Sequence, residues 1–88
     1  MVLKRDKLSI ISEILQKCVG GATKTAIVYQ VNLNFKTVNP YLDLLIARGL
    51  LEVSQGSTVT YTTTEKGVKL LEDLKRVHDV LKETSEQD

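Results

Sequence analysis

Apolar residues recur at every third or fourth position near the start of the chain, with polar residues between them. These apolar positions are Leu8, Ile11, Ile14, Leu15 and Cys18. Because side chains three and four residues apart share one face of a helix, the pattern predicts an amphipathic helix over residues 6–18. Gly20 and Gly21 follow this pattern and are expected to end the helix.

Two more helices are predicted on either side of a short polar turn. Thr23 is placed to cap a helix from Lys24 to about Gln30, since its hydroxyl can accept a hydrogen bond from a first-turn amide. Asn32 and Asn34 flank Leu33 in the turn, where asparagine tolerates a left-handed backbone. A third helix is predicted from a second apolar series at helical spacing: Val38, Tyr41, Leu42, Leu45 and Ile46.

Pro40 leaves two alternatives for the start of the third helix. If Asn34 caps the helix, Pro40 lies in its second turn, has no amide hydrogen for the Lys36 carbonyl, and kinks the axis. If Asn39 is the cap, Pro40 takes the first helical position, which suits proline, and the preceding residues form a separate turn. In both cases Gly49 is expected to end the helix.

Two strand-like runs follow the third helix. Leu51 and Val53 alternate with polar residues, and residues 58–63 are rich in β-branched side chains. Residues 55–57 supply the turn between them. A hairpin after three helices is the layout of a winged helix-turn-helix. We therefore predict an α+β, mostly helical fold with a winged helix-turn-helix DNA-binding domain at residues 1–64.

The last predicted element is a long helix over residues 65–84, preceded by a capping signature at residues 62–65. Val68 and Leu71 can cover the domain core, but a further apolar series continues outward. This series is Leu70, Leu74, Val77 and Leu81. We expect it to hold a homodimer, because a short helix alone in water is only marginally stable. The alternative is that the helix folds back on its own domain. Residues 85–88 are expected to be disordered.

Charge is distributed unevenly along the 88 residues, although the net charge is only +1. Residues 1–62 carry seven basic and four acidic side chains, which gives a net charge of +3. Residues 63–88 carry five basic and seven acidic side chains, which gives a net charge of −2. The positive part contains the helix-turn-helix pattern. The near-neutral total favours a regulator over a protein that coats DNA, since coating depends more strongly on counterion release.

The sequence contains no pattern typical of an enzyme, a metal site or a membrane protein. Cys18 lies on an apolar helical face and is expected in the core, and His78 has no second ligand near it in sequence. The glycines match no phosphate-binding motif. No cofactor is expected. With no membrane-spanning run and no secretory leader pattern, we expect a cytoplasmic, nucleoid-associated protein.

Candidate DNA contacts follow from the way a helix-turn-helix meets duplex DNA. The amino end of its second helix reaches base edges, so the groove candidates are Asn34, Lys36, Thr37 and Asn39. Asparagine can pair bidentately with adenine, and lysine can contact guanine. Lys24 is expected to contact phosphate, as are Gln55, Ser57 and Thr58 at the hairpin tip. The alternative interpretation is that all of these are solvated surface residues.

Four segments together resemble a family of small archaeal winged-helix proteins. They are residues 20–29, residues 32–35 with the sequence Asn-Leu-Asn-Phe, residues 41–51 and residues 61–67. The family includes predicted transcriptional regulators and a Sulfolobus DNA-binding protein that dimerises through a long C-terminal antiparallel coiled coil. The resemblance, which covers about residues 4–80, implies double-stranded DNA as ligand, a homodimer held by the last helix, and no catalytic activity.

We therefore expect a homodimeric DNA-binding protein, an archaeal transcriptional regulator, with its third helix in the major groove. One alternative is a chromatin-like architectural protein. The other is an interaction module that uses the winged-helix surface or the apolar seam to bind another protein.

Overall fold

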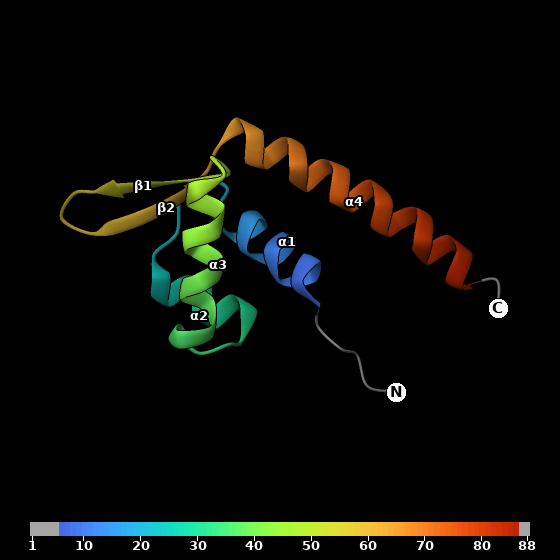
Figure 1. Cartoon of the computed structure of the whole chain (residues 1–88), viewed down its shortest axis with the longest axis horizontal. Coiled ribbons are helices and arrows are strands. Elements are labelled where there is room, and N and C mark those ends of the chain that lie inside the picture. Colours follow the sequence, from blue (N-terminus) through green and yellow to red (C-terminus); the bar gives the residue numbers. More distant parts are fainter. Residues whose placement is uncertain (1–5, 87–88) are drawn as a thin grey trace.

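The computed structural model describes residues 6–86, with the side chains of His78 and of residues 82–86 left out of the description. Figure 1 shows three short helices packed together, a hairpin that projects from them, and a long last helix. The elements are α1 (Lys7–Lys17), α2 (Lys24–Val31), α3 (Phe35–Ala47), β1 (Leu51–Gln55), β2 (Val59–Thr63) and α4 (Glu65–Glu86). This order confirms the predicted winged helix-turn-helix fold.

Side-chain caps define where α2 and α3 begin. The Thr23 hydroxyl accepts a hydrogen bond from the Ala26 amide at 3.2 Å, and Asn34 Oδ1 accepts one from the Thr37 amide at 2.8 Å. Asn32 adopts the left-handed conformation, with φ 59° and ψ 43°, directly after α2. The turn and the Thr23 cap were predicted, because each depends only on neighbouring residues, and Asn34 was one of the two caps left open for α3.

Helix α3 runs without a break across Pro40, so the alternative start at Asn39 is wrong. The Lys36 carbonyl still loses its usual amide partner at Pro40. Two features outweigh that loss: Asn34 caps the first turn, and the inward face of the helix is fully buried. That face consists of Val38, Leu42 and Leu45.

The cap of α4 differs from the expected one. Residues 62–65 fit a capping box in which Thr62 would bond the Glu65 amide. Instead the Thr64 hydroxyl accepts a hydrogen bond from the Gly67 amide at 3.1 Å and donates one to the Gly49 carbonyl at 2.7 Å. Thr64 is preferred because its hydroxyl also satisfies a carbonyl at the end of α3.

The core lies between the three short helices and the base of the hairpin. Thr63, a buried residue of β2, donates a hydrogen bond from its hydroxyl to the Leu15 carbonyl at 2.6 Å, and its amide donates to the Cys18 carbonyl at 3.0 Å. Ala22 and Tyr61 form an isolated antiparallel bridge beside these bonds. The base of the hairpin is thus fixed to the end of α1, which sets the direction in which the hairpin projects.

The hairpin pairs β1 and β2 antiparallel, with Val53 opposite Tyr61 and Gln55 opposite Val59. Its turn occupies residues 56–58, one residue later than predicted. Beyond the base most of its side chains are exposed. We call this hairpin the wing.

Cys18 is fully buried in the core, as predicted. Burial raises the pKa of its thiol to about 11, with a smaller opposing effect of Lys17. Since the thiolate is the reactive form, we expect native protein at pH 7–8 to react with a thiol reagent at least ~100-fold more slowly than protein unfolded in urea. A measured reaction rate equal in both states would contradict the buried position.

Helix α4 has two halves with different surroundings. Its first half packs beside α1, with Leu70 and Leu71 against the core, and its second half extends past the domain (Figure 1). The Cα radius of gyration is therefore 13.9 Å, against about 12 Å for a compact chain of this length. The helix continues to Glu86, so Ser85 and Glu86 are helical rather than disordered as expected. Residues 87–88 of the expected tail lie outside the described part.

Candidate nucleic-acid interface

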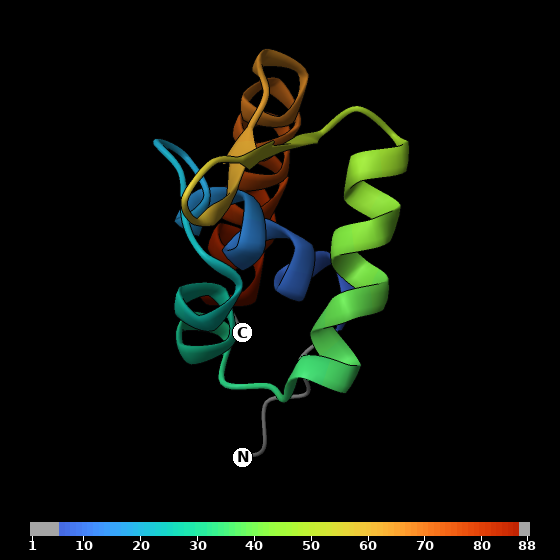
Figure 2. The same ribbon diagram turned by 90° about the vertical axis from the view of Figure 1, so that its left-hand side faces the viewer.

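The amino end of α3 lies beside α2 at the lower edge of the molecule in Figure 1, away from the wing and from the free end of α4, and Figure 2 shows the turn that leads into it from α2. Its first turn exposes three consecutive side chains: Phe35, Lys36 and Thr37. Asn34 is also exposed, but its Oδ1 is already occupied as the cap acceptor. Asn34 therefore cannot pair bidentately with adenine while it caps the helix. Asn39 is only half-exposed, so Lys36 and Thr37 are the best-presented polar groove candidates.

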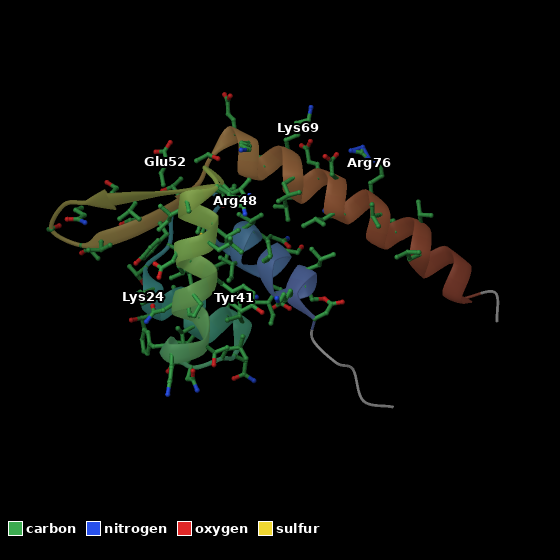
Figure 3. The ribbon with its side chains drawn as sticks, in the orientation of Figure 1. Lys24, Tyr41, Arg48, Glu52, Lys69 and Arg76 are labelled. Atoms are coloured by element: carbon green, nitrogen blue, oxygen red, sulfur yellow. The ribbon has the colours of Figure 1, made fainter. Side chains whose placement is uncertain are left out.

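Lys24 occupies the first position of α2 and is half-exposed. In Figure 3 it lies on the side of α3 toward which the wing projects. A lysine at a helix amino end adds charge where free amides already favour an anion. The position suits a phosphate contact, which stays a prediction.

The predicted wing contacts Gln55, Ser57 and Thr58 are exposed at or beside the hairpin turn. They lie at the other end of α3 from Lys36, because the wing follows the carboxyl end of that helix. The structure therefore gives two separate contact regions rather than one cluster. No residue of the wing, 51–63, is basic, so the tip offers hydrogen bonds to phosphate but no positive charge.

One acidic side chain interrupts the outward face of α3. Asp43 is exposed seven residues after Lys36, and this spacing brings it back to nearly the same face of the helix. Its carboxylate repels phosphate but can accept a hydrogen bond from the cytosine amino group.

An apolar surface surrounds the turn between α2 and α3. Tyr29 is 84% exposed and Phe35 is 47% exposed, although the helices that carry them also contain fully buried residues. Both line a shallow hollow at the turn, together with Thr25, Val28, Asn32, Leu33 and Asn34. Sequence reasoning missed these two aromatic residues. The available signal was that neither belongs to the apolar series predicted to face the core.

The predicted dimerisation seam is exposed only in its outer part. Leu70 packs against the core of its own domain, because α1 runs beside the first half of α4. Leu74 is half-buried, whereas Val77 is 56% and Leu81 is 61% exposed. We call Leu74, Val77 and Leu81 the α4 seam. The first half of the helix thus packs on its own domain, as the second alternative expected, and the outer half does not; the homodimer stays a prediction.

The α4 seam continues onto α1 through an exposed leucine. Leu8, Leu74, Val77 and Leu81 line one shallow hollow between the two helices. Leu8 and Leu74 also line a second hollow, whose other residues include Ile11, Leu44 and Leu70. The exposed apolar surface therefore spans three helices.

Among the side chains that the structure describes, no three His, Cys, Asp or Glu residues are grouped closely enough to hold a metal ion. Over the same part of the chain, no helix has both the length and the apolar character needed to cross a bilayer.

Comparisons with known proteins agree with this geometry. A family model described as winged helix-turn-helix matches residues 4–82. An uncharacterised protein of Methanocaldococcus jannaschii is 38% identical over 76 residues, which make up 85% of this chain and 35% of that protein. A second uncharacterised protein of the same organism is 30% identical over 79 residues, 89% of this chain and 78% of that one. The chain thus spans about a third of the first relative and most of the second.

A solved structure is similar along almost the whole chain. It is the crystal structure of Sso10a-2, a DNA-binding protein from Sulfolobus solfataricus. The superposition has a TM-score of 0.76 at 25% sequence identity, and it covers 94% of this chain and 92% of that one. The long last helix is therefore included in the shared architecture.

Proposed function

This chain belongs to the winged helix-turn-helix family, and we propose that it binds double-stranded DNA as a homodimer and regulates transcription in an archaeon. The observation that carries the proposal is the first turn of α3, in which Lys36 and Thr37 are exposed. The similarity to Sso10a-2, described as a DNA-binding protein, supports the same ligand.

In the proposed complex the amino end of α3 enters the major groove and α2 crosses the phosphate backbone. Lys36 reaches base edges or phosphate, and Lys24 contacts phosphate beside the amino end of α2. The wing tip adds hydrogen bonds through its uncharged side chains. Each protomer supplies few positive charges to this surface, so useful affinity requires two protomers on one duplex.

The α4 seam is the proposed homodimer interface. Its apolar side chains are more than half exposed at Val77 and Leu81, and a second copy of the helix would cover them. The seam lies on a part of the molecule distant from the α2–α3 turn (Figure 1), so dimerisation would leave both groove-reading ends free. Two reading ends on one dimer favour a target with two half-sites.

Two competing roles make different predictions. An architectural protein would bind every duplex similarly, whereas the small positive charge and the carboxylate of Asp43 on the reading face favour selective binding. An interaction module would bind no duplex at low salt. The exposed aromatic residues at the turn are the feature that favours such a module.

The test is a titration of a labelled duplex at about 50 to 200 mM salt, measured by fluorescence anisotropy. Two copies of Lys24 and Lys36 neutralise about four phosphates, so we expect a log–log slope of about −3 to −4. A Lys36→Glu variant should bind at least ~10-fold more weakly and reduce the slope by about 2, because both copies lose a contact.

Lys69→Glu is the matched control, since it makes the same charge change on α4. Figure 3 shows Lys69 on the side of α4 turned away from Lys24. We expect this variant to bind almost as well as the wild type. Failure of the wild-type protein to bind any duplex at low salt would refute DNA binding, and equal affinities for Lys36→Glu and Lys69→Glu would refute the assignment of α3 to the groove.

A further inference from the structure

We propose that the first turn of α3 recognises the C5-methyl group of thymine through Phe35, with Tyr29 forming the other side of the contact. This inference rests on the proposed DNA binding and names the base that the helix reads. It predicts a preference for target sites that carry thymine where the amino end of α3 enters the groove.

The exposure of Phe35 has no structural explanation within the domain. It occupies the first position of α3 and is 47% exposed. The apolar contact that commonly fixes a helix start joins the residue before the cap to the fourth helical residue. Here those residues are Leu33, which packs against the core, and Val38, which is buried in it. Phe35 is therefore not needed to hold the turn.

Polar readout at the same place is limited. Asn34 Oδ1 already accepts a hydrogen bond from the Thr37 amide at 2.8 Å, and Asn39 is half-buried. The exposed reading surface of the first turn is therefore Phe35, Lys36 and Thr37. Its largest side chain can neither donate nor accept a hydrogen bond, so on the edges of paired bases in the groove it adds affinity by covering an apolar group.

Thymine carries the one apolar group on the major-groove edges of unmodified DNA. Its C5-methyl group contacts apolar side chains, including phenylalanine, in protein–DNA complexes. The hollow beside Phe35 is lined by Tyr29, Val28 and Leu33 in addition to polar turn residues, so a methyl group there would meet carbon atoms on several sides. The chemistry of the hollow thus matches thymine better than any other base.

The experiment compares two duplexes of equal length, alternating dA–dT and alternating dA–dU, which differ only in the thymine methyl groups. We expect wild-type protein to bind the dA–dU duplex at least about fourfold more weakly, the effect of one buried methyl group. Phe35→Ala should bind both duplexes at the level of the wild type on dA–dU. Phe35→Leu, which keeps an apolar side chain, should retain part of the difference.

Val19→Ala is the matched control. Val19 is 53% exposed and lies just after α1, outside both α3 and the α4 seam. This variant should discriminate between the duplexes as the wild type does. Equal binding of wild-type protein to both duplexes overturns the inference and leaves DNA binding intact. Binding to neither overturns both, and discrimination that survives Phe35→Ala overturns the role of Phe35.

Discussion

A Gly67→Ala variant is expected to lose about 3 kcal/mol or more of its free energy of unfolding, a large part of the stability of so small a domain. Gly67 lies in the first turn of α4, where the helix approaches the end of α3 closely. An added Cβ would overlap the Leu50 carbonyl oxygen and would lie 2.6 Å from Thr63 Cγ2. Neither neighbour can move easily, because Leu50 O accepts the Thr64 amide and Thr63 is bonded to α1.

Urea denaturation followed by far-UV circular dichroism measures this loss, at one protein concentration because dimerisation would add to stability. Gly56→Ala is the control, since a Cβ at Gly56 in the wing turn would contact nothing within 4 Å. We expect the control to change stability by less than about 1 kcal/mol. A similarly small change for Gly67→Ala would mean that α4 does not pack as closely against Leu50 as described.

Elements that depend on neighbouring residues were predictable from the sequence. The caps at Thr23 and Asn34 and the left-handed turn at Asn32 each involve residues within a few positions of one another. Most of the apolar series of α1 and α3 is buried as expected, at Ile14 and Leu45 among others, but Leu8 was wrongly placed on the core face and is 59% exposed, because it lies in the first turn of α1 beside the outer part of α4. Helical periodicity and capping chemistry are local, so one sequence contains enough information to place them.

Features that join distant parts of the chain were not predictable. Thr64 rather than Thr62 caps α4 because its hydroxyl also reaches the Gly49 carbonyl, which belongs to the end of α3. The bridge between Ala22 and Tyr61 likewise joins two connections that no periodic pattern marks. The sequence left open whether α3 continues across Pro40. The answer depends on how other helices bury the inward face of α3, and the residues around the two possible caps do not show this.

For the candidate site residues, the sequence predicted which side chains are exposed more accurately than it predicted the task of each. Lys36 and Thr37 are exposed as expected, but Asn34 was given two tasks that compete for the same oxygen. Phe35 and Tyr29 were given no role, although neither belongs to the apolar series predicted to face the core. How much of each side chain stays exposed depends on packing between helices, and only the folded structure shows that.

A Val77→Glu variant is expected to convert a dimer into a monomer. In the proposed homodimer Val77 packs against the partner copy, and each dimer would bury two new carboxylates without counter-charges. An uncompensated buried charge costs about 3–5 kcal/mol, so the dimer dissociation constant should rise more than ~100-fold. Val77 is 56% exposed in the single chain, so the substitution leaves the fold of one protomer undisturbed.

Sedimentation equilibrium measures the molecular mass in solution. We expect twice the protomer mass of 9.8 kDa for the wild-type protein and the protomer mass for Val77→Glu. Val19→Glu is the matched control, because Val19 is 53% exposed and lies just after α1, outside the α4 seam. This variant also replaces an exposed valine by glutamate, and it should leave the dimer intact. If DNA affinity falls in Val77→Glu and not in Val19→Glu, two linked reading helices are needed for binding. An unchanged mass for Val77→Glu would show that the exposed half of α4 does not hold the copies together.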